Sequence, residues 1–166
     1  MHFFSDKYDT LIQRSVKRWW PDFPDWKFWK AQLYQESLLN PDARSSVGAE
    51  GIAQFMPATW AEVSRQIGAA GVSAREARYA IDGGAYYMAS LRRVWTHGRT
   101  VYERHNLAEA SYNTGTGNVL HAQRLCGGAI LWKDIMPCLP KVTGRDAKQT
   151  TDYVKRIAKW REMMGD

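Results

Sequence analysis

The chain has 166 residues, of which 45% are hydrophobic and 24% charged, and these values are typical of a globular protein. This length predicts one domain over residues 1–166 with a single core. The net charge of +6 favours anionic partners, but no nucleic-acid-binding motif accompanies it, so we expect no nucleic acid partner. The His and Cys residues lack metal-ligand spacing, so we expect no metal site.

The first residues of the chain do not have the architecture of a signal peptide. Asp6, Lys7 and Asp9 interrupt any apolar run there. No apolar run elsewhere approaches the roughly 18 residues of a membrane-spanning helix. We therefore expect a protein with no export signal of its own.

Helical patterns dominate the sequence, whereas alternating strand patterns are scarce. Proline, glycine and capping residues separate the helical segments. The expected helices cover residues 5–18, 26–39, 60–67, 74–80, 82–95, 103–113, 117–125 and 147–163. The expected architecture is a compact all-α domain of about seven to nine helices with little or no sheet.

Several of these helices have recognisable end signals. Asp25 is expected to cap the helix of residues 26–39. Residues 59–62 and 73–76 both have the capping-box pattern, in which Ser or Thr precedes Glu by three positions. Gly115 is expected to end the helix of residues 103–113.

The densest basic cluster consists of Arg14, Lys17 and Arg18, beside Trp19 and Trp20. Such a cluster is compatible with a solvated helix face and with a weak contact to an anionic outer membrane. Two cysteines, Cys126 and Cys138, leave two alternatives open. They form one disulfide if the protein works outside a reducing cytosol, or they remain two free thiols.

Glu36 is the most informative residue of the chain. It lies near the C-terminal end of an expected helix that is apolar almost all round, with Trp26, Trp29 and Leu33 near it. Burial and the helix dipole both favour the neutral carboxylic acid. A carboxylic acid that stays neutral near pH 7 is the group that acid catalysis on a glycosidic oxygen needs.

Four segments of the chain resemble motifs of the soluble lytic transglycosylases, glycoside hydrolase family 23. In chain order these are Gln35-Glu36-Ser37, Gly51-Ile52-Ala53-Gln54-Phe55-Met56-Pro57, Ala110-Ser111-Tyr112-Asn113-Thr114-Gly115 and Gln149-Thr150-Thr151-Asp152-Tyr153-Val154. The three departures are Ile52-Ala53 in place of Leu-Met, Ser111 before Tyr112 where an apolar residue is common, and Gln149 in place of Glu. The resemblance implies a lysozyme-like fold and a bacteriolytic enzyme that degrades peptidoglycan.

The resemblance also assigns roles to individual residues. It makes Glu36 the single catalytic acid and base. Ser45 matches a serine that hydrogen-bonds near the N-acetyl group of the substrate or the catalytic Glu. Gln54 and Met56 match positions that line the floor of the glycan groove. Tyr112 and Asn113 match the pair that faces the sugar, and Tyr153 matches the tyrosine that contacts the catalytic Glu.

The implied reaction cleaves the β-1,4 bond between N-acetylmuramic acid and N-acetylglucosamine and forms a 1,6-anhydro ring, without a cofactor. A goose-type lysozyme shares the fold and the glutamate but hydrolyses the bond. That alternative stays open because Asp42 and Glu50 follow Glu36 and could hold a water. A non-catalytic wall-binding module is a third alternative, although such a module is expected to have lost Glu36.

A short basic domain of this kind resembles a phage endolysin used for host cell lysis. On this reading the protein is a monomer made in the host cytoplasm, and it reaches periplasmic peptidoglycan after holin release. The alternatives are a virion-associated lysin and a bacterial remodelling enzyme.

Overall fold

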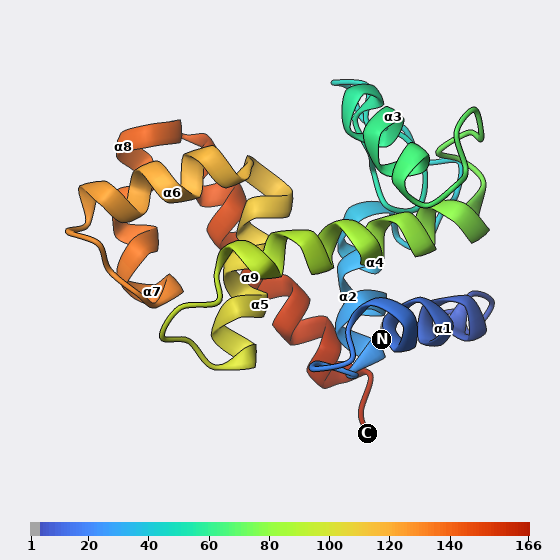
Figure 1. Cartoon of the computed structure of the whole chain (residues 1–166), viewed down its shortest axis with the longest axis horizontal. Coiled ribbons are helices and arrows are strands. Elements are labelled where there is room, and N and C mark those ends of the chain that lie inside the picture. Colours follow the sequence, from blue (N-terminus) through green and yellow to red (C-terminus); the bar gives the residue numbers. More distant parts are fainter. Residues whose placement is uncertain (1–3) are drawn as a thin grey trace. The chain divides into compact units, whose positions relative to one another are not determined.

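The computed structural model describes residues 4–166 of the chain, and these residues are mostly helical (Figure 1). The long helices are α1 (Asp9–Trp19), α2 (Trp26–Ser37), α3 (Pro57–Gln66), α4 (Ala77–Val94), α5 (Val101–Thr114), α6 (Thr116–Leu125) and α9 (Asp146–Met163). Short turns of helix are α7 (Trp132–Ile135), η1 (Met136–Cys138) and α8 (Pro140–Thr143). In this part of the chain, β-pairing is limited to two isolated bridges, so the all-α prediction is confirmed.

The chain divides into two compact units. The first contains the residues up to Tyr87 together with Ile157–Asp166, and the second contains Met88–Arg156. Helices α4 and α9 each contribute residues to both units. Among the residues that the structure describes, no helix is long and apolar enough to cross a membrane.

In the first unit, tryptophan side chains attach α1 and α2 to α4. The fully buried indoles of Trp20 and Trp29 donate hydrogen bonds to the carbonyl oxygens of Ala85, at 2.9 Å, and Ile81, at 3.2 Å. The two rings also contact each other, with their centroids 5.9 Å apart. Because these bonds satisfy the indole N–H groups, both large side chains can be buried without a polar penalty.

Helix α4 runs without a break through the position where two helices were expected. The prediction of separate helices at 74–80 and 82–95 is therefore wrong. Gly83 and Gly84 each weaken a helix by about 1 kcal/mol relative to alanine. Here they make room for tryptophan rings: a Cβ on Gly83 would lie 2.9 Å from the ring of Trp60, and a Cβ on Gly84 would overlap Trp29. The packing energy of these rings offsets the weak helix propensity.

The capping predictions were only partly correct. Helix α3 begins at Pro57 with Met56 at the N-cap, so the box at residues 59–62 is wrong, because the helix has already begun there. The hydroxyl of Ser73 accepts a hydrogen bond from the backbone N–H of Arg75, within a turn that precedes α4. The box at residues 73–76 is therefore also wrong.

Asp25 takes the N-cap position of α2, but its side chain does not cap the helix. Its carboxylate instead accepts hydrogen bonds from the Nε atom of Arg161 at 2.9 Å. The bond between Asp25 and Arg161 joins the beginning of α2 to the end of α9 within the first unit.

The second unit is held by local contacts and one covalent bond. Helix α5 begins at a cap that sequence inspection missed, in which the hydroxyl of Thr100 accepts from the backbone N–H of Glu103 at 3.2 Å. Helix α5 ends before Gly115, as expected. Cys126 and Cys138 form a disulfide, which answers the question that the sequence left open.

Gly51 gives a test of the loop that follows α2. Its φ of +86° is strained for any L-residue, and a Cβ would overlap the carbonyl oxygen of Ala74. Gly48 has a similar φ of +93°, but its Cβ would meet nothing within 4 Å. We expect Gly48→Ala to cost about 1–2 kcal/mol of unfolding free energy from backbone strain alone. Gly51→Ala should cost clearly more, as measured by urea unfolding, and equal costs would contradict the close approach.

Candidate functional site

Glu36 lies one residue before the C-terminal end of α2 and is partly exposed. The helix buries Trp29, Ala31 and Leu33 completely, so its position in the first unit is firmly determined. It ends at Leu38, which adopts the left-handed conformation with a φ of 57°. The preceding residue, Gln35, accepts a hydrogen bond through Oε1 from the indole of Trp160 at 2.9 Å. Glu36 therefore lies on a well-anchored turn.

Ser37 joins the end of α2 to the loop that carries the next motif. Its hydroxyl lies 2.7 Å from the carbonyl oxygen of Ile52 and 3.1 Å from that of Leu33. Both Ser37 and Ile52 are buried. The sequence showed Ser37 as part of a motif without giving it a role, and the structure shows that it links Glu36 to the loop of residues 38–56.

Ser45 organises a turn inside this loop. Its backbone N–H donates to the carbonyl oxygen of Ala49, and its side-chain oxygen accepts from the N–H of Ala49, both at 2.9 Å. These bonds fix the conformation of residues 45–49. A contact of Ser45 with Glu36 or with a substrate stays a prediction.

Gln54 and Met56 follow at the end of the same loop. Gln54 has a φ of 52°, and its side-chain amide donates to the carbonyl oxygens of Ala43 at 3.1 Å and Gly51 at 2.9 Å. These two bonds fix the orientation of the side-chain amide. Met56 is 43% exposed, which is unusual for a methionine and suits a surface that contacts a ligand.

Three candidate residues lie in the second unit, on α5 and α9. Asn113 accepts a hydrogen bond through Oδ1 from the hydroxyl of the buried Thr150 at 2.7 Å, which ties the end of α5 to α9. Tyr112 is partly exposed, whereas Tyr153 is only 4% exposed. The predicted contacts of Tyr112, Asn113 and Tyr153 with the sugar or with Glu36 stay predictions.

A buried ionisable pair in the second unit escaped sequence inspection. His105 and Glu109 lie one helical turn apart on α5, each 1% exposed, with Nε2 and Oε2 3.6 Å apart. Burial lowers the pKa of His105 well below its usual value, and the positive charge of the buried Arg92 lowers it further. Burial raises the pKa of Glu109 well above its usual value. The spacing of i and i+4 was the only available signal, and it does not reveal burial.

No cluster of three or more His, Cys, Asp or Glu side chains that could hold a metal ion occurs within residues 4–166. Within the first unit, the candidate groups are the partly exposed carboxyl group of Glu36 and the side chains of Gln54 and Met56. This set can transfer a proton and can orient a neutral polar ligand such as a sugar.

Comparison with known proteins places this arrangement in a family. The sequence model of the transglycosylase SLT domain matches residues 25–134, which is more than half of the chain. The chain therefore belongs to the SLT-domain family, and the predicted resemblance to the soluble lytic transglycosylases is confirmed.

Two curated relatives are both named membrane-bound lytic murein transglycosylase F. The protein of Pseudomonas syringae pv. syringae (strain B728a) is 32% identical over 152 residues, which cover 89% of this chain and 28% of the relative. The protein of Shewanella frigidimarina (strain NCIMB 400) is 35% identical over 134 residues, which cover 78% of this chain and 27% of the relative. The chain thus spans less than a third of the length of these relatives.

A solved structure supports the same assignment. The 70 kDa soluble lytic transglycosylase of Escherichia coli matches with a TM-score of 0.75 and 26% identity, over 98% of this chain and 25% of that protein. This similarity confirms the predicted lysozyme-like all-α fold.

Ser37→Ala tests whether the end of α2 depends on its bond to the loop. The substitution leaves the buried carbonyl oxygen of Ile52 without this partner, which should lower the free energy of unfolding by about 1–3 kcal/mol. Ser64→Ala is the matched control, because the buried Ser64 hydroxyl bonds only to Ala61 of its own helix, at 3.3 Å. Equal effects in urea unfolding would contradict a special role for Ser37.

The His105–Glu109 pair predicts a defined pH dependence of stability. In the folded protein Glu109 holds one proton and His105 none. Between the usual pKa values of 4.5 and 6.5 the unfolded chain also holds one proton, on the histidine, so this pair contributes no slope there. Above pH 6.5 the unfolded chain loses that proton, and stability should fall as pH rises, by at most about 1.4 kcal/mol per unit.

Glu109→Gln removes the proton that the folded protein retains. In this variant stability should be flat above pH 6.5 and fall below it, because only the unfolded histidine then gains a proton. Urea unfolding at several pH values, with the exposed Glu62→Gln as control, measures the difference. Parallel pH curves for the wild type and Glu109→Gln would show that the pair does not titrate in this way.

Proposed function

We propose that this chain is the catalytic part of a peptidoglycan lytic transglycosylase with Glu36 as its single acid and base. Membership of the SLT-domain family over residues 25–134 supports this activity. The observation that carries the assignment of Glu36 is its position at the end of α2, on a turn that Ser37 bonds to the Gly51–Gln54 motif loop. The substrate is the glycan strand of peptidoglycan.

In the proposed reaction, neutral Glu36 protonates the oxygen of the β-1,4 bond between N-acetylmuramic acid and N-acetylglucosamine. The bond from this oxygen to the anomeric carbon of N-acetylmuramic acid breaks. The acetamido oxygen of N-acetylmuramic acid assists at that carbon. The Glu36 carboxylate then accepts the proton of the C6 hydroxyl, whose oxygen bonds to the anomeric carbon. The product is a 1,6-anhydro sugar, and no water is consumed.

The paired state of Glu50 favours ring closure over hydrolysis. A goose-type lysozyme needs a further carboxylate to hold the attacking water. The oxygens of Glu50 lie 3.7 Å from Arg44 and 3.8 Å from Arg75, so this carboxylate is engaged by two guanidinium groups. Asp42 is exposed at the surface of the loop. The attraction to two arginines makes Glu50 a weaker base than an unpaired carboxylate would be.

The biological setting is part of the same proposal. The Cys126–Cys138 disulfide is typical of proteins that work in an oxidising compartment such as the periplasm. A net charge of +6 suits a protein that approaches an anionic envelope. Both features support action on periplasmic peptidoglycan. We further propose that the protein is a monomeric endolysin of phage-induced host lysis, with weak contact to the outer membrane through Arg14, Lys17 and Arg18.

Glu36→Gln should abolish peptidoglycan cleavage while the unfolding free energy changes little, because glutamine keeps the shape but cannot donate the proton. Mass analysis of wild-type digests should show muropeptides one water lighter than hydrolysed ones. The exposed Glu62→Gln serves as the control and should keep full activity. Hydrated products would overturn the ring closure, and cleavage by Glu36→Gln would overturn the catalytic assignment.

A further inference from the structure

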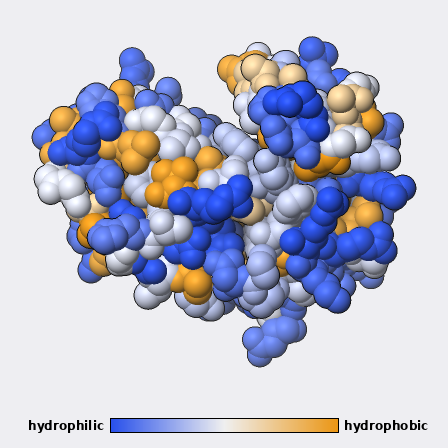
Figure 2. Space-filling model, viewed as in Figure 1, coloured by the Kyte–Doolittle hydropathy of each residue, from blue (hydrophilic) through white to orange (hydrophobic). Residues whose placement is uncertain are grey.

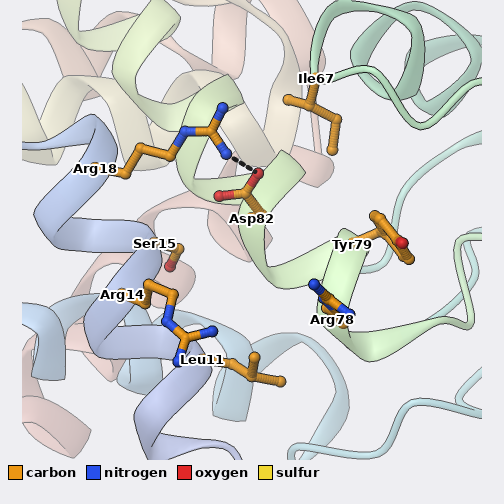
Figure 3. Close-up of a pocket in the computed structure, with 8 residues that line it drawn as sticks. All are labelled: Leu11, Arg14, Ser15, Arg18, Ile67, Arg78, Tyr79 and Asp82. Carbon is orange, nitrogen blue, oxygen red and sulfur yellow. Dashed lines mark hydrogen bonds and ion pairs between the residues drawn. The ribbon is translucent and has the colours of Figure 1, made fainter.

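A pocket with a volume of about 200 Å³ opens between α1 and α4, within the first unit (Figure 3). Helix α1 contributes Arg14 and Arg18, and the beginning of α4 contributes Arg78 and Asp82. Figure 3 shows Arg14 extending from α1 toward α4, where Arg78 lies opposite. Three guanidinium groups thus share one concave site with a single carboxylate.

Arg18 and Asp82 are held in place by their neighbours. Arg18 Nη1 lies 3.3 Å from Asp82 Oδ2, and the guanidinium lies over the Trp19 ring, 4.5 Å from its centroid. The indole of Trp19 donates to Asp82 Oδ1 at 2.9 Å. Both oxygens of Asp82 therefore already have partners, and Arg18 is oriented before any ligand arrives.

Arg14 and Arg78 are not neutralised in this way. Within residues 4–166 neither forms an ion pair with a carboxylate, and the Arg78 guanidinium lies over the ring of its neighbour Tyr79, 5.7 Å from the centroid. The residues that line the pocket therefore have three positive charges and one negative charge, an excess of two. Figure 2 shows that the surface over α1 is mainly hydrophilic. Arg14, Arg18 and Arg78 are all exposed, so their charge is open to a ligand in water.

We propose that this pocket binds the phosphate monoester of a phosphorylated sugar. A phosphate monoester has a charge of about −1.5 to −2 at neutral pH and three acceptor oxygens, which match the excess charge and the planar N–H forks of arginine. A carboxylate has one charge and two oxygens and leaves part of the site uncompensated. Tyr79, Leu11 and Ile67 line the same pocket and offer apolar surface for the sugar ring.

The site is distinct from the region of Glu36 and does not depend on the proposed reaction. The pocket also predicts which residues of the basic cluster contact an anionic envelope. Arg14 and Arg18 line the pocket, whereas Lys17 of the same helix does not. A diffuse attraction would use all three cations equally, but a phosphate pocket uses only the two that line it.

Titration of the full chain with glucose 1-phosphate, followed by NMR of backbone amides and indole N–H groups, tests the proposal. The Trp19 indole signal should shift, and Arg14→Gln combined with Arg78→Gln should weaken binding at least ten-fold. Lys17→Gln removes one charge from α1 outside the pocket and should change the affinity less than two-fold. An equal loss in Lys17→Gln, or full binding by the double variant, would overturn the pocket.

Vesicles distinguish the phosphate monoester from a general anionic surface. Sedimentation with vesicles containing lipopolysaccharide, which has sugar phosphates, should exceed sedimentation with phosphatidylglycerol vesicles of the same charge. The double variant should lose that excess. Equal binding to both vesicles would overturn the choice of a phosphorylated sugar. Glu36→Gln should bind as the wild type does, so failure of the catalytic proposal and failure of this one remain distinguishable.

Discussion

The position of Glu36 depends on the contact between Trp29 and Gly84. The Trp29 ring occupies the space that any side chain at position 84 would fill, and its indole N–H bonds to α4 through Ile81. Ala53 of the motif loop approaches the same glycine: a Cβ there would lie 3.5 Å from the Ala53 methyl group. Because Gly84 has no side chain, both α2 and the loop of residues 38–56 can pack closely against α4.

Hydrogen bonds within the first unit also fix the two residues on either side of Glu36. Ser37 bonds to the loop, and Gln35 bonds to Trp160 of α9, so both neighbours of Glu36 in the chain are fixed. In the proposed reaction one carboxylic acid exchanges a proton with two different oxygens, and fixed surroundings favour this because small displacements weaken proton transfer. Buried tryptophans and a buried serine hold this end of α2, whereas the Asp25–Arg161 ion pair holds its beginning.

Many of the helix positions could be predicted from the sequence, because local patterns determine helices. The end of α5 at Gly115 and the position of Glu36 near the end of α2 were correct for that reason. The break expected before Asp82 was wrong because Gly83 and Gly84 serve tertiary packing, which local propensity does not include. Likewise, the Arg14 cluster was visible, but Arg78 is distant in sequence and becomes its neighbour only through the packing of α1 on α4.

Residues Asp82, Gly83 and Gly84 of α4 form one short segment with two different tasks. The glycines make room for Trp60 and Trp29, which position α3 and α2. Asp82 accepts bonds from Trp19 and Arg18 and so reduces the repulsion among the arginines of the pocket. Without this carboxylate, three guanidinium groups would repel one another, and α1 would be less stable against α4. Asp82 orients Arg18 but does not neutralise Arg14 and Arg78. The pocket therefore keeps two positive charges, which suit a bound dianion.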